Sequence, residues 1–305
     1  MTAGTTPPAT PGAWVGRAAG RLLALAAGLA LLGGAACGGD ESASASGTVL
    51  PPGMTQIPQS DEPPPPAIPF SPATPRYVVR EVASVAHDRG AFTEGLLVHD
   101  GVLYESTGIE GRSDVRRVEL ATGRVLQRAA LPDQYFGEGI VVLRDRLYQL
   151  TWKSGKGWVR DPATLAPLDS FSYTGEGWAM TTDGTQIYMS DGTSRLRVVD
   201  PAGFRVVRTI DVTEAGQPVH YVNELEWVKG EIWANVWLKD LVARIDPATG
   251  RVVGWIDLGP LAAAARRENP NVDVTNGIAY DAAGDRVLVT GKYWPRLVQI
   301  EVVRQ

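Results

Sequence analysis

Five similar phrases recur between residues 93 and 285, and they constrain the fold more than any other feature of the sequence. The phrases are TEGLLVHDG (93–101), GEGIVVLRD (137–145), GEGWAMTTDG (175–184), NELEWVKG (223–230) and NGIAYDAAGD (276–285). Each is followed by a second and a third short apolar run, and four repeats add a fourth. Four strands in a repeat of roughly 45 residues are typical of a propeller blade. The repeats therefore predict an all-β, five-bladed β-propeller with four antiparallel strands per blade.

The two ends of the repeat region predict how the ring closes. The last repeat ends after its third strand, at residue 305, so its fourth strand must come from elsewhere. Residues 77–85 (YVVREVASV) precede the first phrase and alternate in polarity as a strand does. We expect this N-terminal strand to pair with the last blade, which removes exposed strand edges. A split β-sandwich is the alternative, and five matched repeats argue against it.

The N-terminal segment resembles an export signal. Arg17 and Arg21 flank an apolar core at 22–36, which is shorter than the roughly 20 residues that span a membrane as a helix. Small residues then precede Cys37, as in bacterial lipoproteins whose cysteine is lipidated. We expect residues 1–37 to be a lipoprotein signal, and ordinary secretion is the alternative. Both place the mature protein outside the cytoplasm, tethered to a cell-envelope membrane or secreted into the periplasm or medium.

A segment of unusual composition separates this signal from the repeats. Residues 38–76 are rich in Ser, Gly and Pro and contain PPPP at 63–66. Such a segment buries too little apolar surface to offset the entropy of ordering. We expect a disordered tether over 38–76 and a single folded domain over 77–305.

Composition argues against several kinds of partner and site. The formal net charge is −5, whereas nucleic-acid binding needs clustered Lys and Arg. The sequence contains one cysteine, so no disulfide can form within the chain. His87, His99 and His220 show no metal-ligand spacing, so no metal site is predicted, and any metal would be held by oxygen atoms. We expect a monomer that contacts a membrane only through its lipid.

The repeated phrases also predict where a site lies. The innermost strand of each propeller blade lines the central channel, so the aligned polar residues should converge at one of its ends: Glu94, Glu138, Glu176, Asn223 and Asn276. Alternatively these residues only shape the turn into each blade. For Glu176 and Asn276 this structural role explains the pattern as well as a role in a site does. Glu138 lies between two glycines and beside aromatic residues. Burial raises the pKa of such a carboxylate and makes it a candidate for proton transfer. Glycines beside the aligned residues allow close approach of backbone, and we expect those that flank Glu138 to admit the N-terminus of a substrate.

Three tryptophans support a binding site at this place. Trp152, Trp178 and Trp237 occupy inner positions in consecutive repeats. Tryptophans are often core residues, but Trp152 and Trp237 each end a second strand, where a side chain reaches the channel mouth. Indole faces around a carboxylate suit a ligand with a cationic amine and an apolar stem.

Ten phrases carry a resemblance to a known family. They occur in order as AFTEGL, LYESTG, FGEGI, LYQLTWK, GEGW, MSDG, NELEW, ANVW, NGIAY and VTGKYWP. From about residue 77 to 303 the chain resembles the plant and bacterial, papaya-like glutaminyl-peptide cyclotransferases. The resemblance implies a five-bladed propeller that converts N-terminal glutamine of peptides or proteins to pyroglutamate with release of ammonia. It implies no cofactor and no catalytic zinc, and a structural calcium in the channel is compatible with it.

The resemblance also implies site residues. Catalytic roles fall on Glu138, Asn223 and Lys292, with Glu138 moving a proton and the other two contacting the carbonyl oxygen. Substrate-binding positions fall on Phe92, Glu94, Phe136, Trp152, Trp178 and Trp237. Papaya-like members have glutamine where this chain has Glu94, and a second carboxylate near Glu138 raises the pKa of one of the pair.

Two other functions remain open at this point. Carboxylates in the channel are also compatible with a calcium-dependent lactonase-like propeller. A non-catalytic lipoprotein, whose propeller binds peptides or scaffolds partners, is the second alternative.

Overall fold

A computed structural model describes residues 67, 68 and 70–305. The predicted signal over 1–37, with Cys37, and most of the predicted tether lie outside the described residues. In the part that is described, no helix is both long and apolar enough to cross a membrane.

The described chain is built almost entirely of antiparallel β-sheets. The first of three four-stranded sheets contains β2 (Thr93–His99), β3 (Val102–Thr107), β4 (Asp114–Val118) and β5 (Val125–Ala130). The second contains β6 (Gly137–Leu143), β7 (Arg146–Thr151), β8 (Lys156–Arg160) and β9 (Pro167–Ser172). The third contains β10 (Met180–Thr182), β11 (Ile187–Met189), β12 (Arg195–Asp200) and β13 (Arg205–Asp211). The fourth has eight strands: β16 (Val222–Val228), β17 (Glu231–Val236), β18 (Leu241–Ile245), β19 (Val252–Asp257), β1 (Arg76–Ala86), β22 (Arg296–Arg304), β21 (Arg286–Gly291) and β20 (Thr275–Asp281). A short hairpin joins β14 (Thr213–Glu214) and β15 (Gln217–Pro218).

The eight-stranded sheet joins the two ends of the repeat region. β1 pairs antiparallel with β22 from Tyr77↔Arg304 to Ala86↔Arg296, which confirms the predicted pairing of the N-terminal strand with the last repeat. β1 also runs parallel to β19 over three residues, Arg76–Val78. This second pairing merges two sets of four strands into one sheet.

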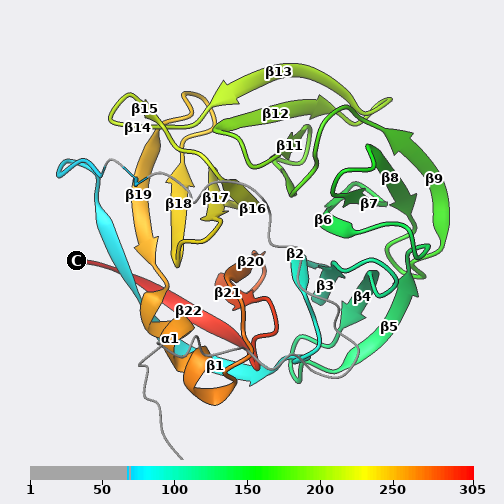
Figure 1. Ribbon diagram of the computed structural model, residues 1–305, viewed down its shortest axis with the longest axis horizontal. Coiled ribbons are helices and arrows are strands. Elements are labelled where there is room, and N and C mark those ends of the chain that lie inside the picture. Colours follow the sequence, from blue (N-terminus) through cyan, green and yellow to red (C-terminus); the bar gives the residue numbers. More distant parts are fainter. Residues whose placement is uncertain (1–66, 69) are drawn as a thin grey trace, which may run out of the picture. The chain divides into compact units, whose positions relative to one another are not determined.

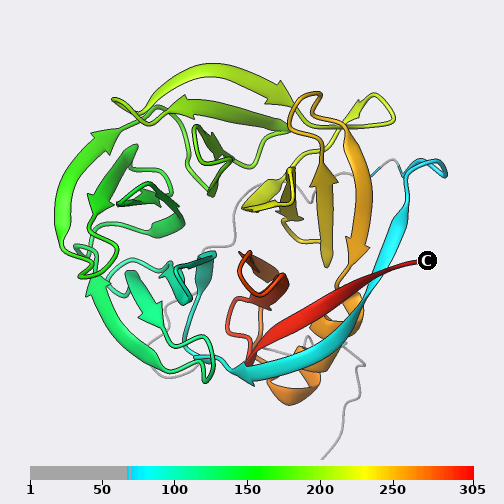
Figure 2. The same cartoon turned by 180° about the vertical axis from the view of Figure 1, so that it is seen from behind.

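The sheets surround a common centre, as the two opposite views of Figures 1 and 2 show. The first strand of each set lies nearest the centre, and these inner strands contact one another in a closed cycle, in the order β2, β6, β10, β16, β20 and back to β2. The inner strand β6 is buried throughout, whereas the outer strand β9 is largely exposed. The all-β prediction is confirmed, and the arrangement is propeller-like.

The hydrophobic core lies between neighbouring sheets. Leu97 of β2 packs with Ile140 of β6 in one cluster, and Val141 packs with Met180 and Ile187 of the next sheet in another. Inner strands therefore carry continuous apolar runs such as IVVL, because both faces of the strand are buried, each against a different neighbouring sheet.

The helix α1 (Gly259–Glu268) lies between β19 and β20 in the chain. It begins with a proline in its first turn and ends with Arg266 and Arg267, both favourable placements. Leu261, Ala262 and Ala265 are buried against the eight-stranded sheet.

Residues immediately before β1 also pack against the sheets. The Phe70 ring meets Trp255 edge-on at 5.4 Å, and the Ser71 N–H donates to Glu214 Oε1 at 2.8 Å. The packed structure thus includes residues upstream of 77.

Candidate active site

Breaks in strand register place the polar residues of the repeats. In β2, β6, β16 and β20 the pairing with the second strand of the sheet shifts at the repeated phrase, between Thr93 and Gly95 in β2 and between Gly137 and Ile140 in β6. A β-bulge of this kind re-aims a side chain and is frequent beside active sites. The residues at the shifts include Glu94, Glu138 and both predicted asparagines.

The glycines that flank Glu138 have a packing role. A Cβ atom on Gly137 would lie 2.6 Å from the Thr107 carbonyl oxygen, and one on Gly139 would lie 2.4 Å from the Ala179 Cα. Both positions face backbone of neighbouring strands, so only glycine lets the inner strands approach. The prediction that these glycines admit substrate was wrong, because protein backbone fills the space in question.

Glu94 is the centre of a buried polar chain. Its Oε1 accepts a hydrogen bond from Lys292 Nζ at 2.8 Å, and its Oε2 accepts one from Asn276 Nδ2 at 3.1 Å. Asn276 Oδ1 in turn accepts a bond from Asn223 Nδ2 at 3.0 Å. The Lys292 ammonium also lies 4.2 Å from the centre of the Phe92 ring. Glu94 of β2 is thereby fixed relative to three residues on or directly after strands of the eight-stranded sheet, Asn223, Asn276 and Lys292.

Glu138 is buried, at 5% exposure, and within residues 70–305 its carboxylate makes no hydrogen bond or ion pair. Burial, followed by the like charge of Glu94, raises the pKa of Glu138 well above its ordinary value. Burial likewise raises the pKa of Glu94 to about 7, although Lys292 opposes this. Burial alone would lower the pKa of Lys292, but Glu94 and then Glu138 outweigh it and raise the pKa. The site thus holds a lysine whose charged form is favoured and two carboxyls whose neutral forms are favoured.

Aromatic side chains form an arc around these groups. One run of ring contacts joins Tyr293 to Phe92 (5.2 Å between centroids), Phe92 to Phe136 (6.0 Å) and Phe136 to Trp152 (5.6 Å). A second run joins Trp178 to Trp237 (5.8 Å) and Trp237 to Tyr221 (5.6 Å). Phe92 and Trp178 are buried, whereas Phe136, Trp152 and Trp237 are partly exposed. We call these seven side chains the aromatic arc.

The structure brings the predicted residues together and adds others. Each predicted site residue belongs to the buried polar chain or to the aromatic arc, except Glu138, which interacts electrostatically with Glu94 and Lys292 of the polar chain. Asn276 and Glu176 also take part, and their alignment with Glu138 in the repeats was the signal for them. Tyr221 and Tyr293 gave no such signal. Both have left-handed backbone (φ 63° and 61°), which is strained for a bulky residue and concentrates at functional sites.

Glu176 bridges the two runs of the aromatic arc. Its Oε2 accepts a hydrogen bond from Trp152 Nε1 and another from Trp178 Nε1, both at 2.8 Å. Its Oε1 lies 3.7 Å from Lys153 Nζ, which in turn lies 3.8 Å from the centre of the Trp152 ring.

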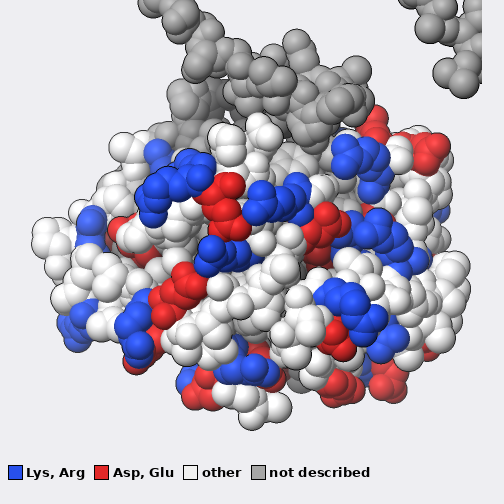
Figure 3. Space-filling model, turned by 90° about the horizontal axis from the view of Figure 1, so that it is seen from below, with Lys and Arg blue, Asp and Glu red and all other residues white. Residues whose placement is uncertain are grey.

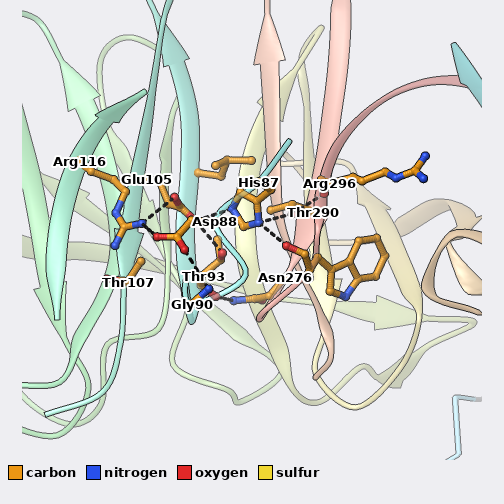
Figure 4. Close-up of polar contacts among 12 residues, drawn as sticks. His87, Asp88, Gly90, Thr93, Glu105, Thr107, Arg116, Asn276, Thr290 and Arg296 are labelled. Atoms are coloured by element: carbon orange, nitrogen blue, oxygen red, sulfur yellow. Dashed lines mark hydrogen bonds and ion pairs between the residues drawn. The ribbon is translucent and has the colours of Figure 1, made fainter. Parts of the chain in front are cut away.

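A second buried network supports the start of β2 (Figure 4). Glu105 Oε1 accepts from Thr93 Oγ1 at 2.7 Å and lies 2.9 Å from His87 Nε2, while the Thr93 carbonyl accepts from Asn276 Nδ2 at 2.8 Å. Arg116 lies 3.8 Å from Glu105 and pairs bidentately with its neighbour Asp114. Glu94 follows Thr93 directly, so this network fixes the backbone that carries it.

In residues 67–68 and 70–305, no three His, Cys, Asp or Glu side chains are grouped so that they could hold a metal ion.

Comparisons with known proteins identify the family of the chain. The sequence profile described as glutamine cyclotransferase matches residues 54–302. A glutaminyl-peptide cyclotransferase of Arabidopsis thaliana is 41% identical over 227 residues, covering 73% of this chain and 71% of that protein. The crystal structure of Myxococcus xanthus glutaminyl cyclase matches with a TM-score of 0.72 at 35% identity, covering 76% of this chain and 99% of that one. The resemblance seen in the ten phrases is confirmed: the chain belongs to the glutamine cyclotransferase family.

Proposed function

We propose that this protein is a glutaminyl-peptide cyclotransferase, an acyltransferase that converts N-terminal glutamine of peptides or proteins to pyroglutamate. Membership of the family and two relatives named for this activity support the assignment. The observation in the site that carries it is Glu138, a buried carboxyl whose pKa is raised by burial and by the charge of Glu94, which is itself paired with Lys292.

The reaction needs no nucleophile from the protein. The free α-amine of the substrate attacks its own γ-carboxamide carbon, a C–N bond closes the five-membered ring, and the bond to the amide nitrogen breaks. The proton lost by the amine is delivered to that nitrogen, which leaves as ammonia. Holding the side chain in this folded geometry contributes up to ~7–11 kcal/mol in favourable intramolecular reactions.

Glu138 is the proton carrier in this proposal. A substrate α-amine has a pKa of roughly 7.7–8, and efficient transfer needs a partner of similar pKa. Burial moves the pKa of Glu138 in that direction, away from the ordinary value of a carboxyl. Glu138 therefore accepts a proton from the amine and returns it to the leaving nitrogen.

Lys292 and Asn223 stabilise the charge that develops on the carbonyl oxygen. Lys292 keeps its ammonium because the two carboxyls raise its pKa. Asn223 Nδ2 gives one hydrogen to Asn276 and retains a second for the substrate. Donors held in place before the reaction lower its barrier without reorganisation. The aromatic arc binds the apolar stem of the glutamine, and its indole faces attract the cationic amine.

A single incubation tests the activity. Protein from residue 38 onward is incubated with a peptide that begins with glutamine, without added metal. We expect the peptide to lose the mass of one ammonia molecule, and the same peptide with an acetylated N-terminus to stay unchanged. An unchanged free-amine peptide, with folded protein, contradicts the assignment.

The same assay separates the alternatives. We propose that catalysis needs no metal, so a chelator should leave the rate unchanged. Loss of all turnover with chelator, together with lactone hydrolysis in untreated protein, favours the lactonase-like reading. Unmodified peptide that nevertheless binds favours the non-catalytic scaffold. Calcium in the channel remains compatible with our proposal as a structural ion, and a chelator should then lower the melting temperature alone.

We propose that the five sets of four strands are five blades of one propeller and that the protein is a monomer. The closed cycle of inner strands supports the blade count. The formal net charge of −5 supports the absence of a nucleic-acid partner, and the face shown in Figure 3 mixes Lys and Arg with Asp and Glu. Light scattering coupled to size exclusion measures the mass in solution, and a dimer mass contradicts the monomer.

We also propose that the protein is exported and anchored through lipid on Cys37, on the sequence pattern alone. Expression of the full chain in a bacterial host with a labelled fatty acid should label the wild type and not Cys37→Ala. Unlabelled wild-type protein in the medium favours secretion instead.

A further inference from the structure

Glu176 joins the two runs of the aromatic arc, which no ring contact in the described part of the chain connects. The first run of the aromatic arc ends at Trp152, and the second begins at Trp178. One carboxylate oxygen of Glu176 accepts the indole N–H of both, at 2.8 Å each. Bonds from a neutral donor to a charged acceptor are stronger than neutral pairs, and two donors on one oxygen fix the angle between the rings.

The backbone around Glu176 is anchored so that the carboxylate has little freedom. Arg197 donates to the carbonyl oxygens of Thr174, at 2.7 Å, and of Glu176 itself. The Gly177 N–H donates to the Trp152 carbonyl at 3.0 Å, which ties this loop to the end of β7. A Cβ atom on Gly177 would lie 2.8 Å from the Tyr173 hydroxyl, so a larger residue here would displace that side chain.

We propose that Glu176 is a positioning residue of the cyclisation site, which fixes the indoles of Trp152 and Trp178 as the two walls against which the substrate glutamine folds. This inference rests on the proposed function and goes beyond it, because it assigns specificity for the folded side chain to a residue outside the reacting centre. Near-attack geometry is the main requirement of the reaction, and misplacement by about 1 Å can cost 10²-fold in rate.

The charge of Glu176 gives a second, independent consequence. Glu138 faces Glu94, Lys292 and Tyr173 as well as Glu176, and Lys153 lies beside Glu176. Among these groups, the charge of Glu176 is one that raises the pKa of Glu138. Removing it should lower the pKa of Glu138 and move the acidic limb of the kcat/KM profile to lower pH, because the base is then unprotonated at lower pH.

The experiment compares Glu176→Ala, Glu176→Gln and a matched control, Glu231→Gln. Glu231 also accepts an indole N–H, from Trp233 at 3.1 Å, and its side chain is 26% exposed against 28% for Glu176. Glu231 is the first residue of β17, whereas the site residues lie near the ends of the second strands, so it is remote from the site. We expect Glu176→Ala to lower kcat/KM by roughly 10- to 100-fold. Glu176→Gln keeps an acceptor oxygen, so it should restore most of that loss while shifting the acidic limb. Glu231→Gln should leave both quantities unchanged.

Two kinetic results overturn the inference. One is a kcat/KM for Glu176→Ala within about twofold of wild type. The other is a Glu176→Gln that is as inactive as Glu176→Ala at an unchanged melting temperature, since the charge would then act on the substrate directly. Exchange of the indole N–H protons of Trp152 and Trp178 gives a readout without turnover: it should accelerate in Glu176→Ala, and equal exchange contradicts the clamp. A wild type without activity contradicts the proposed function, whereas the exchange result tests the clamp by itself.

Discussion

The pairing of Glu94 with Lys292 explains why two carboxyls can be buried a short distance apart. Neither carboxyl is exposed, and burial of two unpaired charges would be costly. The Lys292 ammonium, held by Glu94 Oε1, offsets part of that cost, and the raised pKa of each carboxyl favours its neutral form. The residue that departs from the papaya-like motif therefore acts on the proposed proton carrier through charge.

Glu138→Gln should remove most turnover and leave the fold intact, because the change keeps the volume of the side chain and removes the proton acceptor. Positioned acid–base groups contribute typically 10²–10⁴-fold, so we expect a loss of roughly that size. The measurement is kcat for a glutamine-initiated peptide beside the melting temperature. More than about a tenth of wild-type activity contradicts the role of Glu138.

Glu94→Gln should preserve activity and extend it to lower pH. Removing the Glu94 charge takes away a group that raises the pKa of Glu138 and leaves Lys292 less neutralised, and both effects lower that pKa. A base with a lower pKa is unprotonated at lower pH, so the acidic limb of kcat/KM should move down. Two substrates that differ in amine pKa separate the limb of the enzyme from that of the substrate. If activity vanishes instead, Glu94 is itself the proton carrier.

The list of site residues was predictable only in part. Glu138, Lys292 and the three tryptophans stood in phrases that resemble a family. Glu176 and Asn276 were predicted to lie at the channel, but their roles depend on contacts with other sheets, such as the bond of Glu176 to the indole of Trp152. Tyr221 has a left-handed backbone angle, and its N–H donates to the Gly192 carbonyl; no pattern in the sequence encodes either feature.

At the scale of the elements, each inner strand contributes both to the hydrophobic core and to the candidate site. Each strand packs its apolar residues between neighbouring sheets, and a bulge at its start turns a polar side chain toward the centre. Strand positions followed from short apolar runs, whereas the bulges depend on pairing with the second strand. The glycines were correctly linked to close backbone approach, but the neighbour that approaches is visible only in the folded chain.

Gly139→Ala should destabilise the protein through this contact. The added Cβ would lie 2.4 Å from the Ala179 Cα and 2.8 Å from the Trp178 carbonyl oxygen, so β6 and the segment before β10 must separate. Overpacking costs typically ~1–3 kcal/mol, which corresponds to a fall in Tm of about 2–4 °C for each kcal/mol in a domain of this size.

Gly90→Ala is the control for this substitution. Its Cβ would meet only the flexible side chain of Asp88, at 3.3 Å, so its Tm should stay close to wild type. Equal melting temperatures for both variants would show that the inner strands adjust without cost.

At the scale of the whole described domain, the first and last repeats meet where charge is buried. His87 follows β1 and contacts Glu105 of β3 and the Trp294 carbonyl before β22, so one side chain spans the seam between the first and last repeats. The repeats predicted that a seam exists. They could not predict the ion pair that lies in it, because its members come from strands far apart in the chain.

His87→Gln should reveal a pH-dependent contribution of this pair to stability. Burial alone would lower the pKa of His87, but Glu105 outweighs it and raises the pKa, while burial would raise the pKa of Glu105 and His87 lowers it. The contribution of His87 to the free energy of unfolding is complete below its ordinary pKa near 6.5 and is lost as the pH rises through its pKa in the folded protein. The contribution of Glu105 is lost as the pH falls below about 4.3.

The difference in Tm between wild type and His87→Gln should therefore be largest between about pH 5 and 6.5 and smaller at higher pH. Removal of one member of a buried pair costs about 3 kcal/mol, which sets the scale at the maximum. Calorimetry across this pH range measures it. A constant difference from pH 5 to 9 contradicts a charged His87.

Truncation of the N-terminal segment tests ring closure directly. A chain that begins at residue 67 keeps every contact described above and should melt as the chain from residue 38 does. A chain that begins at residue 77 loses the Phe70–Trp255 contact and the Arg76 pairing, so a modest fall in Tm is expected.

A chain that begins at residue 87 loses all of β1, which leaves β22 and β19 without a partner on one side and exposes two strand edges. We expect this last chain to aggregate or to remain unfolded. The measurement is circular dichroism on heating, together with the soluble yield. A folded chain from residue 87 with the Tm of the longest one would mean that the ring is closed without the N-terminal strand.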